Sequence, residues 1–504
     1  MNLFPFTLNL KPFAFLNVTF YNYLPSAIFV AHILIVAGIT VRGIMQRPAA
    51  GVALAWLFLV ALLPFAGALI YFLVGEKRIG RRRRREIDTL RTDFRKISDA
   101  AIRGSLSNVD WSRHAAAARG IDRLGQKTVG SITVHGSSFQ LFSDTHKVLE
   151  AIAREVDQAE SSVLIEFYIW NEGGKADEVL EAVIRAAERG VSCRLLVDGL
   201  GARPWWKGQQ PQRLRDAGVQ LLAALPVGIF QTFFGRTDLR LHRKIVVIDN
   251  KTAWTGSMNL VDPRFFKQEA GVGQWVDAMV RLQGAVVAPL AATVIGDWSL
   301  ETGEPLRDLI QSSGLDLVEP QGTADIQVVP SGPGQTDDGL LQMLLALINA
   351  AREELVLTTP YLAPDDALIY ALRGAAGRGV KVSLILPQKV DSLLTRYASR
   401  SYYDELLDIG VEIYLYRSGL LHTKSITVDG ALSMFGTVNL DMRSLWIDYE
   451  VSLFVYEPAF AVELRALQQS YIDDSERLDP ALWATRKFWP RFLENTLRLV
   501  SPLL

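Results

Sequence analysis

Cysteine is almost absent from this chain of 504 residues, which contains Cys193 alone. A single thiol excludes an intrachain disulfide and a zinc site built from cysteines, and a buried, inert thiol is the simplest expectation for it. An excess of charge is also missing, since the formal net charge is -1. The whole-chain balance therefore gives no indication of a nucleic-acid binder. The length allows two or three domains, each with a core of its own.

Acidic residues are missing from positions 1–75, which hold only three cations. Two uncharged stretches, at about 24–41 and 53–74, each approach the ~20 residues needed to cross a hydrocarbon core of ~30 Å. They predict an N-terminal membrane region with two transmembrane helices joined by a short loop. The alternatives are a cleaved signal peptide for the first stretch and a buried helix of a soluble domain for the second.

A basic segment, "GEKRIGRRRRREID", follows the second stretch directly. Positive charge beside a span stays on the cytoplasmic side and is attracted to anionic headgroups. We therefore interpret residues 76–125 as a basic collar and linker, and we expect the rest of the chain to lie in the cytoplasm. A nucleic-acid patch or a localisation signal is the alternative for the arginine run.

The remainder of the chain is duplicated. Each copy has a β-rich run, an amphipathic helix, an Arg-Gly-Val step and a buried apolar strand, and ends in a motif, "LHRKIVVIDNKTAWTGSMNL" or "LHTKSITVDGALSMFGTVNL". Such alternation predicts an α/β fold of two tandem halves, 126–320 and 321–480, each a mixed sheet flanked by helices. The separation of the two motifs is domain-sized, far beyond the roughly 20 to 50 residues of a solenoid repeat.

Both motifs carry the same residue types at the same offsets. The two sets are His242, Lys244, Asp249, Ser257 and Asn259, and His422, Lys424, Asp429, Thr437 and Asn439. Alternate residues of a strand face the same side, so each His points with its Lys. The Asp of each set falls where a tight hairpin turn is expected, which favours a turn or salt-bridge role over direct chemistry.

Together, these residue types predict a site for a phosphate. Lysine supplies a fixed charge, and hydroxyl and amide groups bind the non-bridging oxygens. Two histidines can divide the work, one attacking phosphorus and the other protonating the leaving oxygen. No cluster of carboxylates at metal spacing accompanies them, so we predict one active site that is shared by both halves and needs no metal or cofactor.

An attacking imidazole must be neutral on its reacting nitrogen and is usually oriented through the other by a carboxylate. Two candidates, Asp277 and Glu450, begin comparable strands, "DAMVRLQG" and "EVSLFVY". Glu269, in a loop that carries a seven-residue insertion, is a competing candidate.

The doubled pattern H-x-K-x4-D, each time followed by G-[ST]-x-N, resembles the signature of the phospholipase D superfamily. Nearly the whole chain is similar to bacterial cardiolipin synthases of the A-type branch, including "TGSMNLVDPRFFKQEAGVGQWVD", "GTVNLDMRSLW" and the closing "SPLL". This resemblance implies transfer of a phosphatidyl group from one phosphatidylglycerol to another, giving cardiolipin and glycerol. It also implies a multi-pass protein of the bacterial inner membrane that works on anionic lipid and not on nucleic acid.

The resemblance also implies roles for the residues. His242 would be the nucleophile of a phosphatidyl-histidine intermediate and His422 the general acid and base, although the near symmetry of the halves leaves their order open. Asp277 and Glu450 would orient the histidines. The residues that would hold the phosphate are Lys244, Lys424, Asn259 and Asn439, with Ser257 and Thr437 in support, and Asp249 and Asp429 complete the catalytic motifs.

Three other functions are compatible with the sequence. A membrane phospholipase D would release phosphatidic acid, a nuclease would cleave nucleic acid, and a non-catalytic scaffold should have lost at least one His or Lys of the motifs, whereas all four are present. The sequence leaves open the acceptor, which could be phosphatidylethanolamine, and also whether the protein is a homo-oligomer.

The C-terminal segment 481–504 mixes aromatic and basic residues in "ALWATRKFWPRFLENTLRLVSPLL". This composition is typical of an amphipathic helix that lies on a bilayer surface. Packing on the protein core explains the pattern equally well, and both interpretations stay open.

Overall fold

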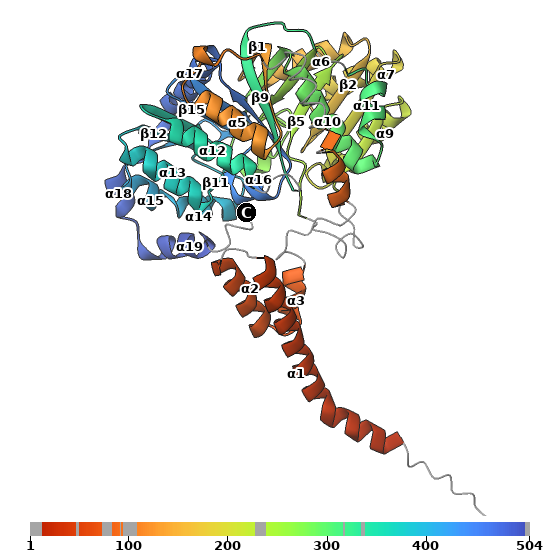
Figure 1. Ribbon diagram of the computed structural model, residues 1–504, viewed down its shortest axis with the longest axis vertical. Helices are drawn as coiled ribbons and strands as arrows, with labels where there is room; N and C mark the ends of the chain where they lie inside the picture. Colours follow the sequence, from red (N-terminus) through yellow and green to blue (C-terminus); the bar gives the residue numbers. More distant parts are fainter. Residues whose placement is uncertain are drawn as a thin grey trace, which may run out of the picture. The chain divides into compact units, whose positions relative to one another are not determined.

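The computed structural model describes residues 13–46, 50–72, 83–90, 92–93, 108–226, 238–315, 318–333 and 338–498. These residues form an N-terminal helical unit and a much larger α/β body. Figure 1 shows the elements of both.

The N-terminal unit consists of helices α1 (Phe13–Gln46), α2 (Ala50–Leu62) and α3 (Ala66–Ile70). Within α1, Pro25–Met45 is long and apolar enough to cross a membrane, and only 6% of its most apolar window is buried in the protein. A helix that is apolar all round and unburied has its apolar surface available to lipid. It contains almost all of the first predicted span, 24–41.

The second predicted span, 53–74, is interrupted. Helix α2 ends before Pro64, whose ring lacks an N–H and clashes with the preceding turn, and Phe65 has a positive φ of 59°. Beyond the break, α3 packs so closely on α2 that a Cβ at Gly67 would lie 2.5 Å from the carbonyl oxygen of Leu59. Residues 73–74 lie outside the described residues. A second crossing therefore stays a prediction, and it cannot be one straight helix.

The α/β body is built on one sheet of 15 strands, in the order β19-β13-β12-β10-β15-β16-β18-β9-β1-β8-β6-β5-β2-β3-β4. The strands of the first half are β1 (Thr133–Phe142), β2 (Ser162–Phe167), β3 (Ser192–Asp198), β4 (Gln220–Ala224), β5 (Lys244–Ile248), β6 (Thr252–Gly256) and β8 (Met279–Gly284). Those of the second half are β9 (Ala324–Ser331), β10 (Glu354–Thr358), β12 (Lys381–Pro387), β13 (Glu412–Tyr416), β15 (Ser425–Val428), β16 (Leu432–Gly436), β18 (Glu450–Val455) and β19 (Ser475–Arg477).

The two halves repeat the same strand order outward from the antiparallel pair β1–β9 at the centre. Each half contains one run of three parallel strands, β2–β3–β4 or β10–β12–β13, and antiparallel strands between that run and the centre, while the second half has an additional edge strand, β19, antiparallel to β13. The predicted mixed α/β sheet with two tandem halves is confirmed. Because the sheet continues through the boundary predicted near Pro320, the halves are parts of one compact unit rather than separate globules.

Helices cover the sheet (Figure 1). The longer ones are α6 (Thr145–Asp157), α7 (Lys175–Glu188), α10 (Val287–Thr302), α12 (Gly339–Ala350), α13 (Asp366–Gly377) and α17 (Pro458–Asp473). Shorter ones are α5 (Ala118–Thr128), α8 (Arg203–Trp206), α9 (Gln210–Asp216), α11 (Leu306–Ser312), α14 (Leu393–Arg400), α15 (Tyr403–Asp408), α16 (Met442–Trp446), α18 (Pro480–Ala484) and α19 (Phe488–Arg498). The duplicated Arg-Gly-Val steps follow α7 and α13, where Gly190 and Gly379 take φ of 90° and 87°.

Part of the predicted basic collar belongs to the body. A helical segment at 83–90 begins with Arg83, which donates hydrogen bonds to the Tyr449 hydroxyl at 3.2 Å and to Glu301 at 2.8 Å. The other collar cations before it lie outside the described residues. The collar is thus attached to α10 and to the residue that precedes Glu450.

Candidate active site

Each motif histidine is fixed by the backbone of the opposite half. Leu241 forms a parallel bridge with Tyr449, and the next N–H, of His242, donates to the Tyr449 carbonyl at 2.8 Å. In the same way strand β14 (Leu420–Leu421) pairs with β7 (Trp275–Val276), and the N–H of His422 donates to the Val276 carbonyl at 2.8 Å. The two histidines therefore lie where the halves exchange short strands.

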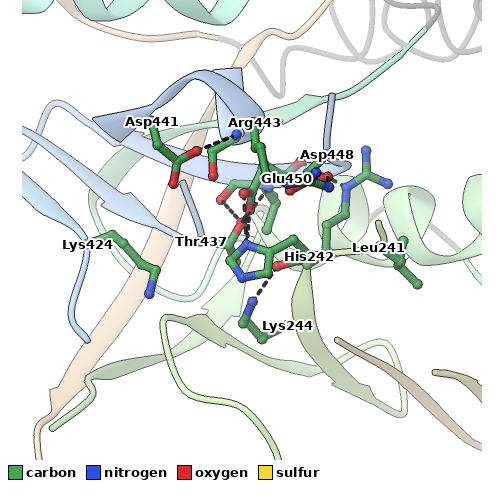
Figure 2. Close-up of polar contacts among 12 residues, drawn as sticks. Leu241, His242, Lys244, Lys424, Thr437, Asp441, Arg443, Asp448 and Glu450 are labelled. Carbon is green, nitrogen blue, oxygen red and sulfur yellow. Dashed lines mark hydrogen bonds and ion pairs between the residues drawn. The ribbon is translucent and has the colours of Figure 1, made fainter. Parts of the chain in front are cut away.

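The carboxylates are exchanged as well. The Nδ1 of His242 lies 2.8 and 2.9 Å from the two carboxylate oxygens of Glu450 (Figure 2). The Nδ1 of His422 lies 2.7 Å from a carboxylate oxygen of Asp277. Each histidine thus pairs with the carboxylate that follows the other histidine in sequence. The competing candidate, Glu269, is exposed in a short 3-10 turn, Gln268–Ala270, and is not part of this arrangement.

The motif hydroxyls hold the carboxylates. Ser257 donates to Asp277 at 2.6 Å and Thr437 donates to Glu450 at 2.5 Å. Each hydroxyl in turn accepts a backbone N–H, from the residue after that carboxylate, at 3.1 and 2.9 Å respectively. Ser257 and Thr437 were expected to support a phosphate, and their hydroxyls instead fix the carboxylates behind the histidines.

Lys244 and Lys424 are fully buried, and each ammonium donates at 2.6 Å to the carbonyl of the histidine two residues before it. Burial lowers the pKa of Lys244 to about 8 against the attraction of Glu450 and Asp277. Burial also lowers the pKa of Lys424 well below its ordinary value, and Lys244 adds to this. An anion placed between the two ammonium groups would relieve this unfavourable crowding of positive charge.

The motif asparagines are buried beside the strands that carry the site. The Oδ1 of Asn259 accepts from the N–H of Ile169 at 3.3 Å. The Oδ1 of Asn439 has no hydrogen-bond partner among the described residues. This oxygen is an acceptor, so only a donor such as a water or a hydroxyl group could complete it.

The two motif aspartates lie in turns, away from the histidines. Asp249 and Asp429 have φ of 52° and 51°, as a tight hairpin turn requires. Their carboxylates accept backbone N–H groups of the segments that lead into β2 and β10, at Glu160, Ser161, Ser162, Arg352, Glu353 and Glu354. Each aspartate lies five positions after its lysine along an extended strand, which corresponds to about 16 Å. The turn role that the sequence favoured accounts for both aspartates, and their place in the catalytic set stays a prediction.

Aromatic rings, which the motif comparison did not single out, cover both histidines. The ring of Tyr168 lies 5.0 Å from that of His242. The rings of Trp275 and Tyr361 lie 4.4 and 6.4 Å from that of His422. The position of Trp275 could have been predicted from the sequence, because it lies two positions before Asp277 and alternate residues of an extended segment face the same side.

The corresponding position before Glu450 is Asp448, so the surroundings of the two histidines differ. Asp448 accepts from Arg443 at 3.0 Å (Figure 2). Burial raises the pKa of Asp448 to about 6 although Arg443 opposes it. No group of three or more His, Cys, Asp or Glu side chains in the described parts of the chain could hold a metal ion.

The pKa shifts distinguish the two pairs. Burial, with Lys244 and Lys424, lowers the pKa of His242 well below its ordinary value, and burial raises that of Glu450. The pKa of His422 is lowered to about 4, mainly by burial, while Asp277 opposes the shift. Burial alone would raise the pKa of Asp277, but His422, Lys424 and Ser257 hold it below its ordinary value. Asp277 therefore stays ionised, whereas Glu450 tends toward the neutral form.

A sheet with two repeated halves and two His-Lys sets that meet between them defines the two-domain phospholipase D-like class. The solved phosphatidylserine synthase of Haemophilus influenzae has this fold, with a TM-score of 0.58 over 76% of this chain and 100% of its own, at 15% identity. The family model described as cardiolipin synthase, PLD-like domain, matches residues 152–275 and 344–471. A model described as phospholipase D-nuclease N-terminal matches residues 28–76.

The more particular relationship comes from curated relatives. Cardiolipin synthase A of Erwinia tasmaniensis is 42% identical over 487 residues, 96% of this chain and 100% of the relative, and that of Cronobacter sakazakii is 41% identical over the same shares. The chain belongs to the cardiolipin synthases, so the predicted family is confirmed, as is its class of enzyme, a phosphatidyltransferase. The apolar helix and the family together make it a membrane-associated protein.

Proposed function

We propose that this cardiolipin synthase transfers a phosphatidyl group from one phosphatidylglycerol to the terminal hydroxyl of another, through a phosphatidyl-histidine intermediate. The observation that carries the proposal is the crossed pairing of His242 with Glu450 and of His422 with Asp277. This pairing leaves two oriented imidazoles and two buried ammonium groups in one site. Such a site fits a double displacement at one phosphorus.

His242 is the proposed nucleophile. With its Nδ1–H directed at Glu450 it presents the Nε2 lone pair, and its lowered pKa keeps that nitrogen free of a proton. It is also the more accessible of the two, with 8% of its surface exposed against 2% for His422. The first step forms the Nε2–phosphorus bond and breaks the bond from phosphorus to the glycerol oxygen.

His422 is the proposed acid and base. The pKa of His422 is about 4 without substrate, so we propose that its imidazolium forms when the anionic phosphodiester binds beside ionised Asp277. The imidazolium then donates its proton to the departing glycerol oxygen. In the second step the neutral imidazole takes the proton of the acceptor hydroxyl. The new oxygen–phosphorus bond then replaces the nitrogen–phosphorus bond, and the enzyme returns to its starting protonation state.

Lys244 and Lys424 are proposed to stabilise the charge on the non-bridging oxygens. Their depressed pKa values reflect crowded, buried cations that an anionic phosphodiester would stabilise. The Asn259 and Asn439 amides complete the proposed phosphate site. No metal or other cofactor takes part in this mechanism.

The membrane orientation is part of the same proposal. A second crossing by the segment of α2 and α3, next to that of α1, would make the protein multi-pass. The basic collar would then hold the α/β body at the cytoplasmic face of the inner membrane. There, anionic phosphatidylglycerol is concentrated by the same positive charge.

The test uses purified full-length protein in EDTA with phosphatidylglycerol labelled in its terminal glycerol. We expect cardiolipin and free labelled glycerol in equal amounts, and His242→Ala should form neither. His146→Ala is the control, because this partly exposed histidine contacts Asp262 at 3.3 Å outside the site. Phosphatidic acid without cardiolipin would instead show that water is the acceptor, and dependence on a metal would contradict the mechanism.

A further inference from the structure

Helix α19 presents an apolar face to the outside of the protein. Phe488, Trp489, Phe492 and Leu493 are all exposed, Trp489 to 73%. The last three lie one, four and five positions after Phe488, which places all four side chains on a single side of the helix. A contiguous patch of large apolar side chains is uncommon on a protein surface and marks a binding site.

The opposite face of α19 is fixed to the second half. Glu494 is buried and accepts from Arg400 at 2.8 Å and from Arg486 at 2.5 Å. At the end of the helix, Arg498 donates to Glu405 at 3.2 Å. These ion pairs set the rotation of the helix, so its apolar face is held outward and does not pack on the sheet beneath.

The neighbouring helix α14 also exposes large apolar side chains. The two helices pack against each other, side by side at one end of the second half (Figure 1). Leu393 and Leu394, at the start of α14, are exposed to 67% and 49%. We call the combined patch the α14–α19 surface, and it consists of Leu393, Leu394, Phe488, Trp489, Phe492 and Leu493.

Charge indicates the partner. The segment 486–498 carries four cations, of which Arg486 and Arg498 are held in ion pairs with Glu494, Asp404 and Glu405, and Arg491 lies 3.9 Å from Asp404. Lys487 and Arg491 are exposed next to the aromatic side chains. Aromatic and aliphatic groups with basic residues at their edge fit the boundary between anionic headgroups and acyl chains. A protein partner with an acidic rim would be an alternative, but the family already places this chain at a membrane.

The α14–α19 surface is connected to the wall of the active site. Asp391, two residues before α14, accepts from Tyr361 at 2.9 Å and from Lys267 at 2.8 Å. Tyr361 is the same ring that lies 6.4 Å from the ring of His422. A bilayer bound to this surface would therefore lie close to the His422 side of the site.

We propose that the α14–α19 surface inserts into the headgroup region of an anionic bilayer and presents the His422 side of the site to the lipid. This second attachment acts in addition to the N-terminal helices. It rests on the membrane location of the enzyme and is independent of which histidine is the nucleophile.

The first test measures contact with lipid directly. Full-length protein carrying Trp489→Cys is labelled there with an environment-sensitive fluorophore and reconstituted in vesicles of phosphatidylcholine and phosphatidylserine. Cys193 is buried and should not compete for the label. We expect quenching by brominated lipids at position 489 but not in the control Val462→Cys, which is 61% exposed on α17. A water-exposed label at 489 overturns the proposal, and quenching by a second labelled copy instead of lipid would mean self-association.

The second test measures the consequence for catalysis. Phe488→Ser, Trp489→Ser and Phe492→Ser are combined, with Val462→Ser and Tyr370→Ser, two other exposed apolar positions, as the matched control. We expect turnover of vesicle substrate to fall at least about tenfold, while turnover in mixed micelles stays unchanged because detergent delivers the lipid. An equal loss of turnover in vesicles and in micelles, or no loss in either, contradicts the proposal. Fluorophore quenching needs no turnover, so it distinguishes failed docking from failure of the proposed chemistry.

Discussion

At the scale of residues, the two copies of the motif are less alike than their sequences. Both histidines are buried and both face a carboxylate, but Glu450 is pushed toward its neutral form and Asp277 toward its ionised form. The difference arises from their surroundings, because Lys424 and His422 act on Asp277 while Asp448 adds negative charge near Glu450. The two carboxylates should therefore differ in their effect on catalysis.

We expect Asp277→Asn to be the more damaging of the two neutral substitutions. It removes the charge that stabilises the His422 imidazolium, so the release of glycerol should slow by about a hundredfold or more. Glu450→Gln keeps an acceptor for the Nδ1–H of His242 and should slow the same step by only about tenfold. Single-turnover measurement of labelled glycerol separates the two, and equal losses would speak against the assignment of acid and nucleophile.

The depressed pKa of His422 also predicts how stability depends on pH. Its pKa is about 4 in the folded protein and 6.5 when unperturbed, so the unfolded chain binds more protons between these values. Stability is fully present above pH 6.5 and should fall by about 3 kcal/mol as the pH drops to 4. Denaturant unfolding of His422→Gln should show a weaker dependence over this range. A pH profile of His422→Gln that is unchanged from that of the wild type would refute the prediction.

At the scale of elements, the sequence was most informative where chemistry is local. The strand after each histidine and the turn at each Asp-Asn or Asp-Gly follow from alternation and from turn propensity, and both are present. The interruption between α2 and α3 did not follow, since an apolar stretch with a proline is compatible with a straight or a broken helix. The ring of Trp275 over His422 also depends on how distant segments meet.

The turn at Asp429 gives a test at this scale. Asp429→Ala removes the acceptor of three backbone N–H groups before and at the start of β10 and should destabilise the fold by about 2 kcal/mol. Because Asp429 lies about 16 Å along the strand from Lys424, we expect kcat per folded molecule to stay within a few-fold of the wild type. Denaturant unfolding and active-site titration measure the two quantities. An Asp429→Ala variant that folds fully but shows no turnover would indicate a direct catalytic role for Asp429.

At the scale of the whole molecule, a single sheet joins the halves and the site exists only where they meet. The duplication and the shared site could be predicted because the same residue types recur at identical offsets. The exchange of carboxylates could not, because the order Asp277 after His242 and Glu450 after His422 is the same for either pairing. Only the bridges of Leu241 with Tyr449 and of β14 with β7 decide it.

The central antiparallel pair β1–β9 suggests how such a chain could arise from a symmetric dimer. In a twofold-symmetric dimer of one half, the two β1 strands would pair antiparallel. Each copy would supply the carboxylate that pairs with the histidine of the other copy, because both sides of an isologous contact are the same. Two identical histidines would then be obliged to serve as nucleophile and acid interchangeably. Joining the copies in one chain removes that obligation, since one carboxylate can become Glu450 while the other is Asp277. The fused chain can thus specialise each side of the reaction, and neither repeat can be lost without disabling the other.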